Sequence, residues 1–241
     1  NGKTLTLGSQ RDITISGTTF TLMDSSEDKT GKIVKTTATG NGVFGVVNSS
    51  VFTMNGGSIE LSDKGYNNGG YDGVIGVYVY PNCVANINGG KITCKIDNYD
   101  LYTNLSYAYA GVCLFVQGEA ATVNVTGGEL TNYEGAVIAG NGQGVRYDGT
   151  IINISGGKII SKSEKNPTRD NSAIYHPQYG VLNISGGYIE GDDGINMKSG
   201  TVKISGGTIV GTVDGDNIQH QGDGSVKTGA ALSITSANNY T

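Results

Sequence analysis

The 241-residue sequence has no tryptophan, only three prolines and only three cysteines. With so few prolines, nearly every residue keeps a backbone N–H donor, as a chain of short hydrogen-bonded strands requires. The cysteines, Cys83, Cys94 and Cys113, form neither a CxxC motif nor an even-numbered disulfide framework. We therefore interpret them as small, buried, apolar residues and expect no redox or metal role for them.

Basic blocks and long apolar runs are also missing. The formal net charge is −5 and the pI is about 5.0, which argues against a nucleic-acid partner and a polybasic membrane patch. No segment approaches the roughly 20 apolar residues that a spanning helix needs, so we expect no membrane insertion. No signal peptide is recognisable. The abrupt start at Asn1 and end at Thr241 suggest a piece of a longer, exported protein.

Glycine, in contrast, is abundant, with 40 residues. Many stand as Gly-Gly pairs in an eight-residue pattern that occurs at 52–59, 85–92, 123–130, 152–159, 182–189 and 202–209. Apolar residues stand four and two positions before the first glycine and two after the second, and most residues between them are polar. Such alternation is typical of strands with one buried face. The glycines predict a bend, because glycine tolerates positive φ and close backbone approach.

Successive Gly-Gly pairs are 33, 38, 29, 30 and 20 residues apart, which indicates one structural unit per repeat with insertions in loops. A single unit cannot bury its apolar face, so the units must stack. The sequence therefore predicts an all-β, right-handed parallel β-helix (β-solenoid) of about seven to eight coils. We expect one domain over 1–241: an irregular first coil and cap at 1–35, stacked coils at 36–225, and a last coil at 226–241 that continues into a longer protein.

A further strand is expected upstream in each unit, after a residue such as Gly42, Gly111 or Gly135. We expect the first apolar residue after this position to face the core and the next one to face outward. The residues expected to face outward are Phe44, Ile75, Cys113, Val137 and Ile174.

Loops of very different length follow the strand after the Gly-Gly pair, so we expect them on one edge of the solenoid. The long ones are 60–72, 95–110 and 160–171, and the first two contain Tyr66, Tyr71, Tyr99, Tyr102, Tyr107 and Tyr109. Aromatic rings beside Asn and Asp side chains offer an apolar face for sugar C–H groups and polar partners for hydroxyls. These tyrosines are candidate ligand-binding residues, unless the rings only pack the loops onto the body.

Acidic residues form a second candidate site. Stacking would bring Asp193 and Asp216 within about 5 Å of each other, with Asp192 adjacent. Carboxylates of this kind suit Ca²⁺, and a pair at this distance also matches a retaining glycosidase. The alternative is that the Asp side chains only close turns. The two histidines, His176 and His220, are interpreted as hydrogen-bonded surface residues.

The repeated Ile-Ser-Gly-Gly-x-Ile sequence, with Gly191-Asp192-Asp193-Gly194-Ile195 between copies, resembles pectin-lyase-like β-helix domains of bacterial cell-surface proteins. Some members of that group are described as carbohydrate-binding and as holding calcium. The opening 1–7, with Asp24-Ser25-Ser26, is similar to the first coil of surface adhesin-like proteins from gut bacteria. The Gly-His-Gly and Arg-Ile-Lys motifs of polygalacturonases are absent, and the pectate lyase arginine cannot be placed. The resemblance therefore implies the fold more than an activity.

The leading hypothesis is a non-catalytic, glycan-binding or adhesin-like module of a secreted or surface-anchored bacterial protein. It would bind a polysaccharide or a host or microbial glycan through the loop face, as a monomeric part of a larger chain. One alternative is a polysaccharide-active enzyme, a glycoside hydrolase or lyase, that uses the stacked carboxylates. Another is a structural stalk or protein-binding segment. Calcium is the one cofactor that the sequence suggests.

Overall fold

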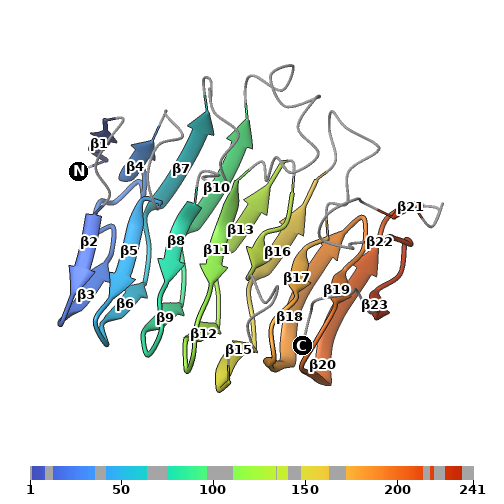
Figure 1. Cartoon of the computed structure of the whole chain (residues 1–241). Coiled ribbons are helices and arrows are strands. Elements are labelled where there is room, and N and C mark those ends of the chain that lie inside the picture. The colour runs from blue at the N-terminus through green and yellow to red at the C-terminus, as the bar shows by residue number, and fades with distance from the viewer. Residues whose placement is uncertain are drawn as a thin grey trace.

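The computed structural model describes residues 2–8, 13–35, 42–63, 75–96, 111–133, 135–140, 148–162, 172–213, 218–219 and 226–234. These residues form strands and turns and contain no helix, hence no apolar helix of the length that crosses a bilayer. Figure 1 shows the strands side by side in rows that advance from the N-terminal to the C-terminal end. The predicted all-β class with parallel strands is confirmed, and the arrangement is compatible with a parallel β-helix.

The first sheet has 13 strands. Strands that follow the glycine pairs, or occupy the same register, are β1 (Thr4–Leu7), β4 (Lys32–Lys35), β7 (Ser58–Asp63), β10 (Lys91–Ile96), β13 (Glu129–Asn132) and β16 (Lys158–Ser161). Those that precede the pairs are β3 (Thr19–Leu22), β6 (Val51–Met54), β9 (Val84–Ile87), β12 (Thr122–Val125) and β15 (Thr150–Ile154). The long strands β18 (Gly180–Gly191) and β20 (Thr201–Gly211) run through the bend and join both rows.

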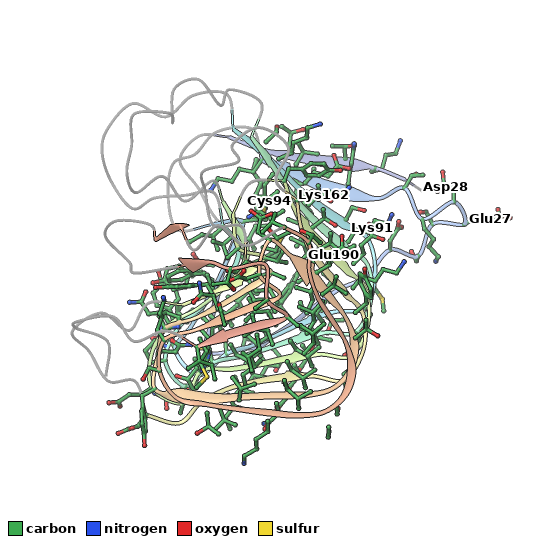
Figure 2. All side chains as sticks on the ribbon, turned by 90° about the vertical axis from the view of Figure 1, so that its right-hand side faces the viewer. Glu27, Asp28, Lys91, Cys94, Lys162 and Glu190 are labelled. Carbon is green, nitrogen blue, oxygen red and sulfur yellow. The ribbon has the colours of Figure 1, made fainter. Side chains whose placement is uncertain are left out.

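The second sheet has eight strands: β2 (Ile13–Ser16), β5 (Phe44–Val47), β8 (Ile75–Val79), β11 (Val112–Val116), β14 (Ile138–Ala139), β17 (Ile174–His176), β19 (Ile195–Met197) and β23 (Leu232–Ile234). Neighbours in both sheets are parallel, whereas the short strands β21 (Ile218–Gln219) and β22 (Val226–Lys227) pair antiparallel. Figure 2, turned 90° from Figure 1, shows strands of successive units overlying one another, with Glu27 and Asp28 projecting away from the body.

The core lies between the two sheets and follows the predicted alternation before and after the glycine pairs. Phe52, Ala85, Val123, Ile152 and Leu182 lie in register on neighbouring strands and are at most 1% exposed. The residues two positions after the pairs, from Ile59 to Ile189, are fully buried as well. The inward face of these strands is therefore confirmed. The exception is β20, where Ile204 is 49% exposed.

Two different constraints require glycine at the bend. A Cβ added to Gly156 would lie 2.3 Å from the carbonyl oxygen of Thr126 in the unit before it. Gly157 has φ +81, and its Cβ would lie 2.8 Å from the carbonyl oxygen of Gly127. The first glycine thus permits close stacking of backbones, whereas the second also adopts a conformation that L side chains avoid. We call this feature the glycine bend.

The expected facing of the second-sheet strands is wrong at four positions. Phe44, Cys113, Val137 and Ile174 belong to the main core, whereas Val112 and Ala136 join a separate buried cluster with Ala139, Tyr175 and Phe115. The physical reason is that alternation is broken at the corner before these strands. Consecutive residues both belong to the main core there, as Cys113 and Leu114 do, and Val137 and Ile138. A glycine alone therefore cannot set the alternation of the strand that follows.

Candidate functional site

The six tyrosines proposed from the sequence, Tyr66, Tyr71, Tyr99, Tyr102, Tyr107 and Tyr109, lie outside the described residues, and their role stays a prediction. The segments that contain them connect β7 to β8 and β10 to β11. The strands that follow these segments in the sequence are β8 and β11, and their outer face is the described surface nearest to the tyrosines in the chain. That face is the candidate site.

Aromatic side chains gather on the outer face of β8 and β11. Tyr78 and Phe115 are register partners on these neighbouring parallel strands, and each alternates with core residues on either side. Their ring centroids lie 5.0 Å apart in an edge-to-face arrangement. Tyr80 follows the end of β8 and also packs against the main core, and its ring stacks on that of Tyr78 with centroids 4.0 Å apart. The three rings and Gln117 are all half-buried, and we call these four residues the aromatic strip.

Polar atoms accompany the rings. The Tyr78 hydroxyl donates a hydrogen bond of 2.7 Å to Oε1 of Gln117. This bond fixes the Tyr78 ring and leaves the strip with hydroxyl and amide groups beside apolar ring surface. Farther along the sheet the same face is closed, because Ala139 and Tyr175 are 1% and 5% exposed. The accessible part of the described face is therefore the end near β8 and β11.

The structure shows the contacts of one of the three candidate acidic residues, Asp193. Asp193 is fully buried, and its carboxylate accepts hydrogen bonds from the backbone N–H groups of Thr228 (2.8 Å) and Gly229 (2.7 Å). It also accepts from the hydroxyls of Thr228 (3.1 Å) and Ser233 (2.8 Å). This arrangement ties β19 to the segment around β23, as expected of an Asp that organises a turn.

The structure describes two of the three residues of the predicted calcium site. Asp192 is 2% exposed, and Asp216 lies outside the described residues. Among the residues that are described, no group of three or more His, Cys, Asp or Glu side chains is placed to hold a metal ion. The Asp192–Asp193–Asp216 site therefore stays a prediction.

His176 is not a surface residue, contrary to the expectation from the sequence. Its side chain is fully buried, and within the described structure neither ring nitrogen has a hydrogen-bond partner. Burial lowers its pKa to about 4, against a small opposing effect of the nearby Gly180 backbone, whose geometry falls short of a hydrogen bond. Gln178 is buried beside Gly140, where its Oε1 occupies space that a Cβ would need. His176 is therefore neutral at pH 7.

A second aromatic group involves Tyr133, which follows β13 of the first sheet. The ammonium groups of Lys95 and Lys162 stand 5.0 and 4.9 Å from the centre of the Tyr133 ring. Two cations on one ring are a favourable cation–π arrangement, and they occupy that ring. Figure 2 labels Lys162 on the side of the cross-section that also carries Lys91 and Glu190. Tyr133 is therefore a weaker candidate for ligand stacking than the aromatic strip.

Sequence reasoning missed the aromatic strip because it assumed strict alternation from the first residue of each strand, whereas Cys113 and Leu114 both face the core. The signal is present in the matching triplets 77–79 and 114–116, in which an aromatic residue stands between two aliphatic ones. Comparisons of the chain with family models, with curated proteins and with solved structures find no match. The proposals below therefore depend on the geometry of this chain and on its sequence pattern.

Proposed function

We propose that the chain is a non-catalytic, glycan-binding, adhesin-like module of a secreted or surface-anchored bacterial protein. Its scaffold would be a right-handed parallel β-helix of about seven to eight coils, of the pectin-lyase-like type. The observation that carries the proposal is the aromatic strip, where three half-buried rings and an amide lie on the outside of a rigid parallel sheet.

The chemistry of the strip suits a sugar. A pyranose ring has apolar C–H faces that pack against aromatic rings, and its hydroxyls require hydrogen-bond partners. Tyr78, Tyr80 and Phe115 offer ring surface, while Gln117 offers an amide beside them. Tyr78 and Phe115 lie in parallel strands, and the backbone N–H groups of Tyr80 and Gln117 donate to carbonyl oxygens of neighbouring strands. Binding would therefore order few side chains and lose little conformational entropy. The predicted tyrosine loops adjoin β8 and β11 in the chain and would extend the same face.

The enzyme alternative draws less support from the described residues. A retaining glycosidase needs two carboxyl groups about 5 Å apart, with one held protonated and both open to the substrate. The carboxylate of Asp193, in contrast, is buried and saturated by donors from Thr228, Gly229 and Ser233. We therefore assign it a structural function.

A glycan array, followed by titration calorimetry with the best ligand, tests the proposal. Tyr78→Ala and Phe115→Ala should each weaken binding about tenfold or more, the equivalent of losing roughly 1.4 kcal/mol of stacking. Tyr179→Ala is the matched control, because Tyr179 is 42% exposed and lies outside the strip. Binding that survives both strip substitutions would reject this site, and a parallel Tyr99→Ala, Tyr102→Ala and Tyr107→Ala series would then test the loops. An array without any ligand would reject glycan binding itself.

A second candidate, a structural spacer, is favoured by one specific observation. Side-chain amides form a continuous ladder along the stack: Asn124 donates to Asn86, Asn153 to Asn124 and Asn183 to Asn153, each at 2.8 Å. A row of such bonds parallel to the stacking direction stiffens the row of strands lengthwise. Glycan binding and a spacer role are compatible in one module, and the array decides whether the first is present.

A further inference from the structure

Two of the three cysteines meet inside the protein. Cys94 lies near the end of β10 and Cys113 near the start of β11, and their side chains are 1% and 0% exposed. Their sulfur atoms are 3.5 Å apart. The third cysteine, Cys83, is buried at the start of β9. The two thiols therefore stand at the two ends of the segment 95–112, Cys94 in the first sheet and Cys113 in the second.

Cys94 occupies a position that is equivalent in several units, just before the chain passes from the first sheet to the second. Lys35, Leu61, Cys94, Asn132 and Ser161 are register partners on β4, β7, β10, β13 and β16. Their side chains point into the corner between the two sheets, which we call the polar corner.

Hydrogen bonds close the polar corner in three of these units. Nζ of Lys35 donates to the carbonyl oxygen of Gly42 at 3.0 Å, and Oγ of Ser161 to that of Gly135 at 2.7 Å. Asn132 Nδ2 donates to the carbonyl oxygens of Gly111 at 2.7 Å and Ala136 at 2.9 Å. In the unit of β10 the side chain at this position, Cys94, contacts the sulfur of Cys113, which also lies 3.6 and 3.5 Å from the carbonyl oxygens of Ile92 and Thr131.

We propose that Cys94 and Cys113 form a disulfide when the protein folds in an oxidising environment, and that this bond closes the polar corner of their unit. The sulfurs would approach from 3.5 Å to the disulfide bond length of about 2.05 Å. The bond would close a loop that includes Tyr99, Tyr102, Tyr107 and Tyr109, and would hold both ends of that loop together.

The oxidant is a small-molecule or protein disulfide. The thiolate of one cysteine attacks that disulfide, forms a mixed disulfide and releases one thiolate of the oxidant. The thiolate of the second cysteine then attacks the sulfur of the first, forms the Cys94–Cys113 bond and releases the second thiolate. The two thiols of the protein lose two protons and two electrons, and the oxidant disulfide is reduced to two thiols.

Burial determines when this reaction can occur. Removal from water, together with the neighbouring Cys113 sulfur, raises the pKa of Cys94 well above its ordinary value. The reactive thiolate is therefore scarce in the folded, reduced protein, and the oxidant has no direct access to the sulfurs. The bond should form while the chain folds, and protein that has already folded in reduced form should oxidise slowly.

The experiment compares protein exported to an oxidising compartment with protein produced under reducing conditions. We expect thiol titration in denaturant to find one thiol instead of three after export, and no loss after reducing production. Trypsin should yield the 92–95 peptide joined to the 96–146 peptide, 2 Da lighter than the sum of the two, because Cys83 lies in a separate peptide. Cys83→Ser is the matched control and should retain the link.

Two results would overturn the proposal. One is three free thiols in the exported, folded protein. The other is a disulfide that joins Cys83 to either partner or is scrambled among all three. If export fails, refolding of the reduced chain in a mixture of oxidised and reduced glutathione provides the same thiol count. Cys94→Ser should then leave both remaining cysteines unpaired, whereas a Cys83–Cys113 bond in that variant would show non-specific oxidation.

Discussion

The glycine bend and the polar corner solve the same problem in opposite ways. Both turn the chain from one strand to the next in successive units, and both stack along the same axis. At the glycine bend the backbone alone makes the turn, and in the pairs from Gly89 to Gly207 a Cβ on either glycine would lie within 3 Å of a carbonyl oxygen of the unit before. At the polar corner, side chains as different as Lys35, Asn132 and Ser161 supply the bonds. The first solution requires sequence identity, whereas the second tolerates variety and long insertions.

The largest effect is expected at the glycine bend. Gly157→Ala combines positive φ with a Cβ 2.8 Å from a carbonyl oxygen, so we expect a loss of about 3 kcal/mol or more in the free energy of unfolding. Gly45→Ala in β5 is the control, because no heavy atom of the described residues lies within 4 Å of its added Cβ. It should change stability by less than about 0.5 kcal/mol. Urea denaturation measures both, and equal losses would contradict the special status of the bend.

The contrast also explains which parts of the fold could be predicted. The bend repeats the same residues at the same spacing, so the pattern from Phe52 to Ile209 predicted strand, turn and inward face together. At the start of the second-sheet strands, consecutive residues such as Cys113 and Leu114 both face the core, so their facing could not be derived by alternation from the preceding glycine. The contact between Cys94 and Cys113 could have been suspected, because Cys94 stands at the fourth position after Gly90, as Asn132 does after Gly128.

The candidate site was predictable in chemistry but not in place. Tyrosine enrichment indicated stacking surface, yet Tyr78 and Phe115 become neighbours only through the register of β8 and β11, which are 37 residues apart at that position. Likewise, Asp193 was recognised as a functional or turn-closing acid. Its partners Thr228 and Ser233 follow an insertion of variable length, and no fixed spacing leads to them.

The second-largest effect is expected from acid, which should lower the stability of the folded protein through the buried His176. His176 faces inward on β17, and its pKa in the folded protein is about 4, against 6.5 for the free side chain. Between these pH values His176 is protonated in the unfolded chain but neutral in the folded protein. The free energy of unfolding therefore falls as the pH drops from 6.5 to 4 and then levels off. The loss amounts to about 3 kcal/mol across this window.

Urea denaturation at pH 7, 5.5 and 4 measures this loss, and His176→Leu should remove the slope within that window. Asp24 provides a separate reference. Hydrogen bonds from Ser26 and Gly31 lower its pKa to about 2, so its stabilising effect is lost only as pH falls from 3.8 towards 2. A variant without His176 that keeps the full slope between pH 6.5 and 4 would show that other groups cause it.

Within the polar corner, the number of bonds lost should set the size of the effect. Asn132→Ala leaves the carbonyl oxygens of Gly111 and Ala136 without this donor in a buried position, and we expect a loss of about 2 kcal/mol. Ser161→Ala removes one bond, to Gly135, and should cost about 1 kcal/mol. Chemical denaturation of both variants checks the order. A larger loss for Ser161→Ala would mean that packing, and not hydrogen bonding, closes the corner.

The smallest effect is expected where neither constraint operates, on the outer surface just before the glycine bend. Asn153→Ala removes two bonds of the amide ladder, to Asn124 and from Asn183, but water can replace them at this half-buried site. We expect a loss of about 0.5 kcal/mol. Ser155→Ala is the matched control. Like Asn153→Ala, it removes the Asn-x-Ser glycosylation sequence of residues 153–155, but it changes an exposed residue and keeps the ladder. If both variants lost the same stability in urea, the ladder would contribute nothing, and the stiffness of the stack would come from the backbone alone.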